Sequence, residues 1–245
     1  MEAVANVMLA LLFGAVSLLY ATVGQAGGTA FLALMAFASF PSNVMRPTAL
    51  LLNIVAATFS TWLFNRESLV DWAKLRPLLL ASLPTALVGG LITLDERLYK
   101  TVTGLVLLLA AIIMAVPRTQ EGDTHRPIPL WGAISIGSVV GLVSGLTGVG
   151  GGVFLVPLLI AMRWVSPKRT AALSAPFILG NSVVGLVGAM CAGQTFAADT
   201  WLFALAAIGG AVIGAIVGLR WWSETMTRYV LAAILGAAGI QMLFF

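Results

Sequence analysis

Long uncharged apolar segments dominate this chain of 245 residues and constrain its fold more than any other feature. Ten such segments follow one another, and eight of them have 16 residues or more. A helix rises about 1.5 Å per residue and the bilayer core is about 30 Å thick, so the eight long segments are expected to span a membrane. The segments are 3–20, 29–40, 47–64, 77–94, 101–116, 129–146, 152–162, 170–198, 200–219 and 229–245.

The composition excludes an ordinary soluble protein. Hydrophobic residues make up 60% of the chain and charged residues 9%, whereas charged residues are about 25% of soluble proteins. The 13 basic residues are scattered between apolar runs, so no nucleic acid partner is expected. We therefore predict an all-α, multi-pass protein whose partner is the lipid bilayer. Its location is the cell membrane, which means the inner membrane in a Gram-negative bacterium.

The two short segments follow glycine clusters that resemble each other. Residues 24–34 (GQAGGTAFLAL) align with residues 148–158 (GVGGGVFLVPL) at a constant offset of 124. As helices, segments 29–40 and 152–162 would be about 18 and 16 Å long, which is too short to span. Both are expected to be half-helices that begin inside the membrane.

The likeness extends beyond the glycine clusters. Residues 46–50 align with 169–173, residues 84–90 with 209–215, and Glu96 and Lys100 with Glu224 and Arg228. This order indicates a tandem duplication: repeat 1 over 1–116, a polar linker over 117–128 and repeat 2 over 129–245. Residues 8–20 have the length of a signal-peptide core, but no basic residue precedes them, so they are expected to form part of a span.

Charge distribution favours inverted repeats over parallel four-helix repeats. If each glycine-linked pair crosses an even number of times, ten basic residues fall on one side and three on the other; a single crossing gives eight against five. The even model places both termini outside the cytoplasm. Its cytoplasmic set is Arg66, Lys74, Arg76, Arg118, Arg126, Arg163, Lys168, Arg169, Arg220 and Arg228.

The glycine loops are the expected binding site for a small anion. A half-helix that begins at such a loop directs free N–H groups and its positive dipole end into the protein. Neutral side chains of nearby spans add donors, although glycine packing and interhelical hydrogen bonds are the alternative explanation. The expected substrate-binding residues are Gly24, Gln25, Gly27, Gly28, Thr29, Asn53, Thr58, Thr147, Gly148, Gly150, Gly151, Gly152, Ser174 and Asn181.

Charged residues are expected only outside the spans. Arg46 and Arg169 occupy matched positions beside the loops, where they could gate the path or attract an anion; arginines that anchor helix ends at the interface are the alternative. With no charge in any proposed span, a buried carboxylate proton relay is not expected.

Few groups are available for catalysis or metal binding. The chain has one cysteine, Cys191, and one histidine, His125, which lies in the polar linker. No cofactor or metal is expected, and the chain is not expected to be an enzyme, although an intramembrane enzyme or assembly factor remains an alternative. The coupling ion and the oligomeric state stay open.

The second loop and the helix start that follows it carry a family resemblance. Residues 148–158 (GVGGGVFLVPL) and 166–171 (SPKRTA) resemble the glycine-rich loop of the TauE/SafE sulfite exporter family. The first loop departs from this pattern at Gln25, Ala26 and Ala33. The resemblance implies a membrane transporter, either a carrier or a channel, of a small sulfur-containing anion such as sulfite or an organosulfonate.

Overall fold

The protein is entirely helical over the part of the chain that the computed structural model describes, namely residues 2–22, 24–116, 128–165, 167–218 and 224–244. The expected linker 117–128 lies outside these residues except for Ile128. The helices are α1 Glu2–Thr22, α2 Gly28–Phe37, α3 Ser42–Arg66, α4 Trp72–Leu91, α5 Glu96–Ala115, α6 Leu130–Thr147, α7 Gly152–Ala161, α8 Pro167–Cys191, α9 Thr200–Gly218 and α10 Glu224–Phe244.

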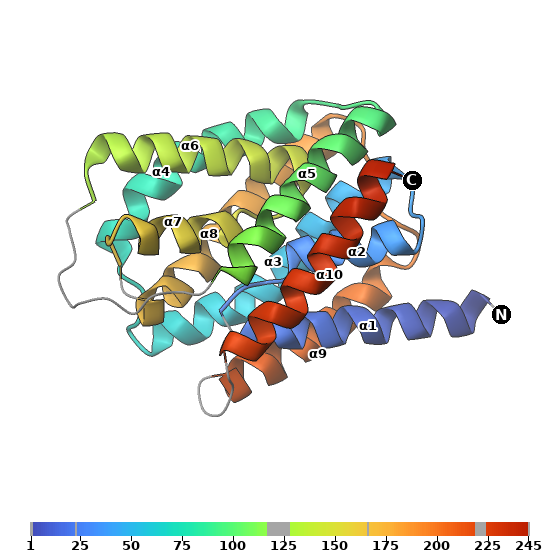
Figure 1. Ribbon diagram of the computed structural model, residues 1–245, viewed down its shortest axis with the longest axis horizontal. Coiled ribbons are helices and arrows are strands. Elements are labelled where there is room, and N and C mark those ends of the chain that lie inside the picture. Colours follow the sequence, from blue (N-terminus) through green and yellow to red (C-terminus); the bar gives the residue numbers. More distant parts are fainter. Residues whose placement is uncertain (1, 23, 117–127, 166, 219–223, 245) are drawn as a thin grey trace.

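The two short segments do form short helices. Helices α2 and α7 each have 10 residues, or about 15 Å, and each begins next to its glycine cluster. Figure 1 shows that α2 and α7 lie toward opposite ends of the long axis, and that α1 begins at the same end of the molecule at which α10 ends. Each short helix therefore turns back toward the end from which the preceding helix came.

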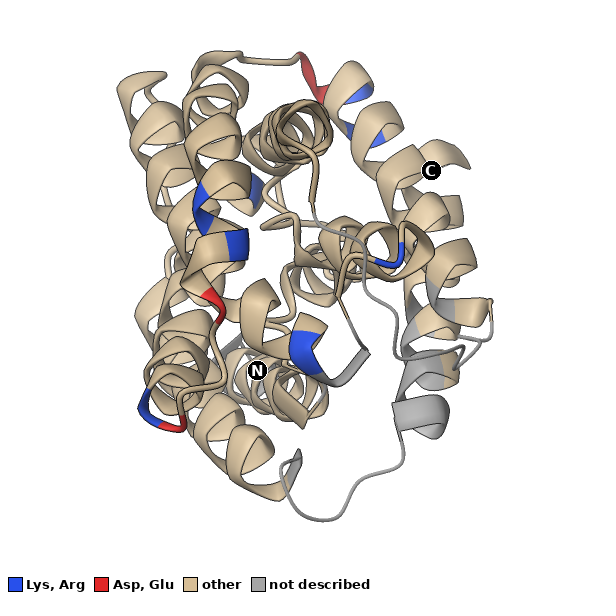
Figure 2. Ribbon diagram, turned by 90° about the vertical axis from the view of Figure 1, so that its left-hand side faces the viewer, with Lys and Arg blue, Asp and Glu red and all other residues tan. Residues whose placement is uncertain are grey.

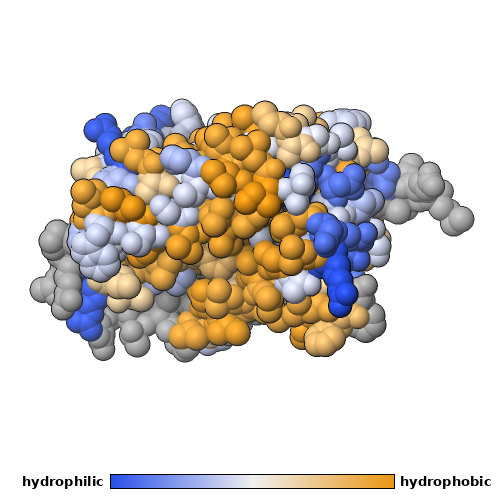
Figure 3. All heavy atoms as spheres, turned by 90° about the horizontal axis from the view of Figure 1, so that it is seen from above, coloured by the Kyte–Doolittle hydropathy of each residue, from blue (hydrophilic) through white to orange (hydrophobic). Residues whose placement is uncertain are grey.

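Four helices are long and apolar enough to cross a membrane by length and composition: Ser42–Arg66, Leu130–Thr147, Arg169–Cys191 and Thr200–Val217. Figure 3 shows a hydrophobic band across the middle of the long axis, with hydrophilic residues at both ends. The exposed tryptophans Trp62, Trp131 and Trp201 lie near the ends of α3, α6 and α9, as expected for a membrane interface.

The helices pack mainly against helices from the other half of the chain. The main pairs are α4 with α6, α1 with α9, α5 with α10, and α3 with α8. Close contact uses glycine: a Cβ on Gly141 would meet the Ser82 carbonyl, and a Cβ on Gly214 would meet the Leu18 carbonyl. Glycines placed in spans thus allow helices to approach closely. The two halves share one core rather than packing separately.

Helix α3 begins earlier than the sequence predicts. The apolar segment begins at Pro47, a residue typical of a first helical turn, but α3 begins five residues before it at Ser42. Proline inside a membrane helix is tolerated where neighbouring groups satisfy the freed carbonyl. Arg46 is consequently part of this helix, one residue before the predicted apolar segment.

Charge otherwise lies near helix ends. Most of the ribbon in Figure 2, which looks onto the end where α3 ends and α4 begins, is free of charged residues. Arg66 ends α3, Lys74 and Arg76 lie in the first turns of α4, and Arg163 follows α7. Arg66 also packs over the Trp62 ring, with its guanidinium carbon 5.4 Å from the ring centre.

Candidate anion site at the glycine loops

The glycine clusters set the starts of both short helices. Gly27 and Gly151 are the N-cap residues of α2 and α7, and both have left-handed backbones with φ of 108° and 80°. A residue with a Cβ is strained in this conformation. Neither helix start has a side-chain cap. In α7 the Phe154 N–H donates back to the Gly151 carbonyl at 3.2 Å, so the N–H groups of Gly152 and Val153 are the ones that can face a ligand. The sequence predicts half-helices over 29–40 and 152–162, and the observed starts at Gly28 and Gly152 agree within one residue.

The two loops meet at Asn53 of α3. A Cβ on Gly28 would clash with the Asn53 amide and with the Val149 carbonyl, and a Cβ on Gly150 would lie 2.8 Å from Asn53 Nδ2. Asn53 is fully buried and its Nδ2 donates to the Gly148 carbonyl at 3.2 Å. Residues that are 120 positions apart in the sequence thus come together around one amide side chain.

One face of α8 lines the second loop. A Cβ on Gly152 would lie 2.6 Å from Ser174 Oγ, and a Cβ on Gly150 would lie 3.3 Å from Ser182 Oγ. Ser174, Ile178, Asn181 and Ser182 follow the helical spacing of four, seven and eight residues, so they share a face. On the other side, Ser144 of α6 lies 3.6 Å from the Cβ position of Gly151.

Several polar atoms around the second loop are buried without a hydrogen-bond partner among the described residues. They are Asn53 Oδ1, Ser144 Oγ, Ser174 Oγ, Asn181 Oδ1 and Ser182 Oγ. An unpaired buried polar group costs about 1–3 kcal/mol, so a cluster of them favours the binding of a polar ligand at this point. The three serine hydroxyls can donate to oxyanion oxygens without carrying charge. Asn53 Oδ1 and Asn181 Oδ1 can only accept, and the Nδ2 groups of these residues donate to the carbonyls of Gly148 and Phe177.

The first loop is different because its buried hydroxyl and its turn have hydrogen-bond partners. Thr29 and Tyr20 share a hydrogen bond between their hydroxyls at 2.6 Å, and the Gln25 backbone N–H donates to the Tyr20 carbonyl at 2.9 Å. Gly24 packs against α8, where an added Cβ would lie 2.6 Å from Ala171 Cβ. These contacts hold α1 and α2 together.

Two expected site residues do not offer free hydroxyls to the second loop. Thr58 is exposed, and its hydroxyl donates to the Ile54 carbonyl at 2.7 Å. Because Thr58 follows Asn53 by five residues, its side chain points about 140° away from that of Asn53 around the α3 axis. Thr147 is buried, but its hydroxyl donates to the Val143 carbonyl at 2.7 Å. Thr147 therefore shapes the end of α6, while Thr58 lies outside the cluster.

Arg46 is wholly buried against helix ends rather than exposed at the surface. Its Nε donates to Gln194 Oε1 at 2.8 Å, and its Nη2 donates to the Gly90 carbonyl at 3.0 Å. Its Nη1 donates to carbonyls of Gly89, Ile92 and Leu146 at 3.2, 2.9 and 3.4 Å. Carbonyls at helix C-termini attract a cation. Arg169, its matched residue, is exposed at the start of α8.

Two residues of the cluster are absent from the expected set of substrate-binding residues. Ser144 lies in an apolar helix where nothing distinguishes it from a serine that bonds within its own turn. Ser182 follows the predicted Asn181, and only the position of the second loop identifies both as neighbours of one site.

The comparison with known proteins assigns the family. The family model of the sulfite exporter TauE/SafE matches residues 9–242. The chain is 37% identical to the probable membrane transporter protein y4hK of Sinorhizobium fredii, covering 96% of this chain and 97% of the relative. It is 24% identical to the probable membrane transporter protein YunE of Bacillus subtilis, covering 100% and 98%.

A further relative is longer than this chain. The probable membrane transporter protein MamO of Paramagnetospirillum magneticum is 28% identical over 86% of this chain, which corresponds to 40% of the relative. No solved structure matches the chain. The glycine loops and the helical membrane fold agree with the family match, and the protein is a multi-pass membrane transporter that belongs to the TauE/SafE family.

Proposed function

We propose that the protein transports a small sulfur-containing oxyanion, such as sulfite or an organosulfonate, and binds it at the second glycine loop. The observation that carries this proposal is the cluster of buried hydroxyls without a partner among the described residues, those of Ser144, Ser174 and Ser182, around the start of α7. A helix N-terminus that meets neutral donors is a suitable site for an oxyanion.

Buried charge also favours an anion over a cation. Arg46 is the one buried charged side chain among the described residues, and no carboxylate neutralises it. Its Cα lies near the second loop, 3.3 Å from the Cβ position of Gly148. A fixed positive charge in a low-dielectric interior attracts an anion and repels a cation.

The transport mechanism that we propose uses two inverted repeats. Two features support it: α2 and α7 begin at matched glycines and lie toward opposite ends, and the helix termini with Arg66, Lys74 and Arg163 lie together. By the positive-inside rule this end faces the cytoplasm, so both chain termini face away from it. One repeat then moves against the other around the site. Reporter fusions at both termini test the orientation.

Flux measurements test the substrate class. Purified protein in proteoliposomes is expected to give saturable flux of radiolabelled sulfite, and unlabelled organosulfonate is expected to compete if it shares the site. Saturation and a turnover number separate a carrier from a channel. Empty liposomes and an Asn53→Asp variant are the controls.

Thermal stabilisation by a panel of anions provides a second test that does not depend on transport. Sulfite or a sulfonate is expected to raise the melting temperature more than chloride, phosphate or acetate. Stabilisation by carboxylates or phosphate alone, together with no sulfite flux, would overturn the substrate class.

A further inference from the structure

The buried Arg46 joins four parts of the molecule at one end. Its acceptors belong to the last turn of α4, the last turn of α6 and the segment between α8 and α9, and the arginine itself is in α3. The C-terminal carbonyls of α4 and α6 have no later turn of helix to bond to, so a cation can satisfy several at once. Arg46 thus closes the packing of these helices at this end.

Three of the five acceptors of Arg46 have counterparts in the other half of the sequence, at positions matched to Arg169. Alignment of the halves places Gly214 opposite Gly89, Ala215 opposite Gly90, and Thr22 opposite Leu146. Thr22 ends α1, and the two others lie in the last turns of α9. Yet Arg169 is exposed while Arg46 is wholly buried. The two halves therefore differ at this one matched pair of cations.

The two glycine loops also contact their neighbouring helices at different positions. A Cβ on Gly148 would lie 3.0 Å from the carbonyl oxygen of Arg46. A Cβ on the matched Gly24 would instead meet Ala171, which is two residues beyond Arg169. Two residues of helix correspond to about 3 Å. The contact of the first loop with α8 is therefore shifted by about 3 Å relative to the contact of the second loop with α3.

We infer that Arg46 and Arg169 form alternating closures at the two ends of the transport path. In the arrangement seen here, Arg46 is closed onto the ends of α4 and α6 and Arg169 is free. In the opposite arrangement, Arg169 closes onto the carbonyls of Gly214, Ala215 and Thr22, and Arg46 is released. This inference rests on the inverted repeats of the proposed function, since only inverted halves put the two closures at opposite ends.

Cysteine labelling tests the exchange without any transported anion. In a Cys191→Ser background, single cysteines replace the matched residues Thr48, which is buried, and Ala171, which is partly exposed. A membrane-impermeant maleimide is applied to each side of vesicles. Arg46→Gln is expected to raise Thr48→Cys labelling at least about tenfold and to lower Ala171→Cys labelling, because hydrogen bonds of a charged group are lost from one state only. Arg169→Gln is expected to raise Ala171→Cys labelling.

Opposite effects of the two arginine variants on the two reporters support the exchange. If Arg46→Gln raised maleimide labelling equally at both reporter cysteines, the substitution would only have destabilised the fold, and the exchange would be refuted. The exchange would also be refuted if the two arginine variants changed labelling of a given reporter in the same direction. If Arg46→Gln does not give a monodisperse protein, Gln194→Ala removes one neutral acceptor and is expected to shift both reporters in the same directions by a smaller factor. If the labelling shows the exchange but no sulfur oxyanion raises the melting temperature, the proposed substrate is refuted and the exchange is retained.

Discussion

The two glycine loops have related sequences and matched helix starts, but their polar surroundings differ. Around the first loop, Thr29 is bonded to Tyr20 and the chain turn is closed by backbone hydrogen bonds. Around the second loop, Ser144, Ser174 and Ser182 are buried with no partner among the described residues. Two loops of similar sequence thus have different surroundings, which fits a supporting role for the first loop and the proposed binding role for the second.

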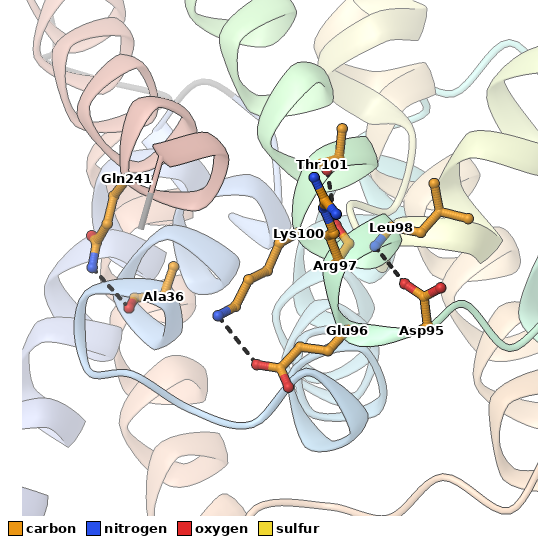
Figure 4. Close-up of polar contacts among 8 residues, drawn as sticks. All are labelled: Ala36, Asp95, Glu96, Arg97, Leu98, Lys100, Thr101 and Gln241. Atoms are coloured by element: carbon orange, nitrogen blue, oxygen red, sulfur yellow. Dashed lines mark hydrogen bonds and ion pairs between the residues drawn. The ribbon is translucent and has the colours of Figure 1, made fainter.

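The outer end of α2 is held by a contact from α10. Gln241 of α10 donates from Nε2 to the Ala36 carbonyl near the end of α2 at 3.2 Å (Figure 4). Nearby, Asp95 caps α5 by accepting from the Leu98 N–H at 2.7 Å, and Lys100 pairs with Glu96 at 3.1 Å. Helix α2 is thus held at its start by Tyr20 and at its end by Gln241, in line with a supporting role.

The largest expected effect is that of Asn53→Asp, which tests the point where the two loops meet. The substitution removes the donor to the Gly148 carbonyl and places a carboxylate beside the proposed anion. Like charges in a buried site repel strongly, so anion affinity is expected to fall at least about 100-fold. Anion-dependent thermal stabilisation measures the loss. Asn43→Asp, at an exposed residue near the start of α3, is the matched control and is expected to retain affinity.

Removal of the unpartnered hydroxyls at the second loop is expected to weaken anion binding without lowering the stability of the fold. Ser174→Ala and Ser182→Ala each delete a donor to a charged ligand, worth about 1.5–3 kcal/mol, so affinity is expected to fall about 10- to 100-fold. Because each lost hydroxyl has no partner, the anion-free protein is expected to melt at the same or a higher temperature. A lower melting temperature with unchanged affinity would contradict a binding role.

The first loop is expected to respond in the opposite way. Thr29→Val removes the 2.6 Å hydrogen bond with Tyr20 while preserving side-chain shape. The anion-free protein is expected to lose about 1–2 kcal/mol of stability, because the buried Tyr20 hydroxyl is left unpaired. Anion affinity is expected to stay within about threefold of the unaltered protein. A loss as large as that of Ser174→Ala would show that both loops bind.

The smallest expected effect is that of Thr58→Ala. This hydroxyl is exposed and bonded to its own helix, so stability is expected to change by less than about 0.5 kcal/mol. Anion affinity and labelled sulfite flux are expected to remain unchanged. Reduced flux in this variant would place the path along the outer face of α3 and away from the second loop.

Much of the fold can be predicted from the sequence. Segments that are apolar and uncharged over long runs must be helical in a bilayer, because every backbone group needs a partner inside the segment. The two short helices follow from their length and the glycines before them, and α6 begins beside Pro129 as expected. The start of α3 could not be predicted, because proline marks a helix start in most sequences but lies inside this helix.

Part of the candidate site can also be predicted. Gly27 and Gly151 are identifiable because only glycine readily adopts their backbone conformation. Which polar residue meets which loop depends on helix rotation and on the contacts between halves. Thr58 and Asn53 belong to the same span, yet a rotation of about 140° separates an exposed side chain from one that touches both loops.

The sequence by itself determined a multi-pass helical membrane protein with two glycine-started short helices, because hydrophobic length and glycine conformation act locally along the chain. Only the tertiary structure decided that Arg46 is buried against helix ends and that the unpartnered polar groups gather around the second loop. Hydrogen bonds between distant helices cannot be read from spacing, since they depend on how the helices rotate and where their ends meet.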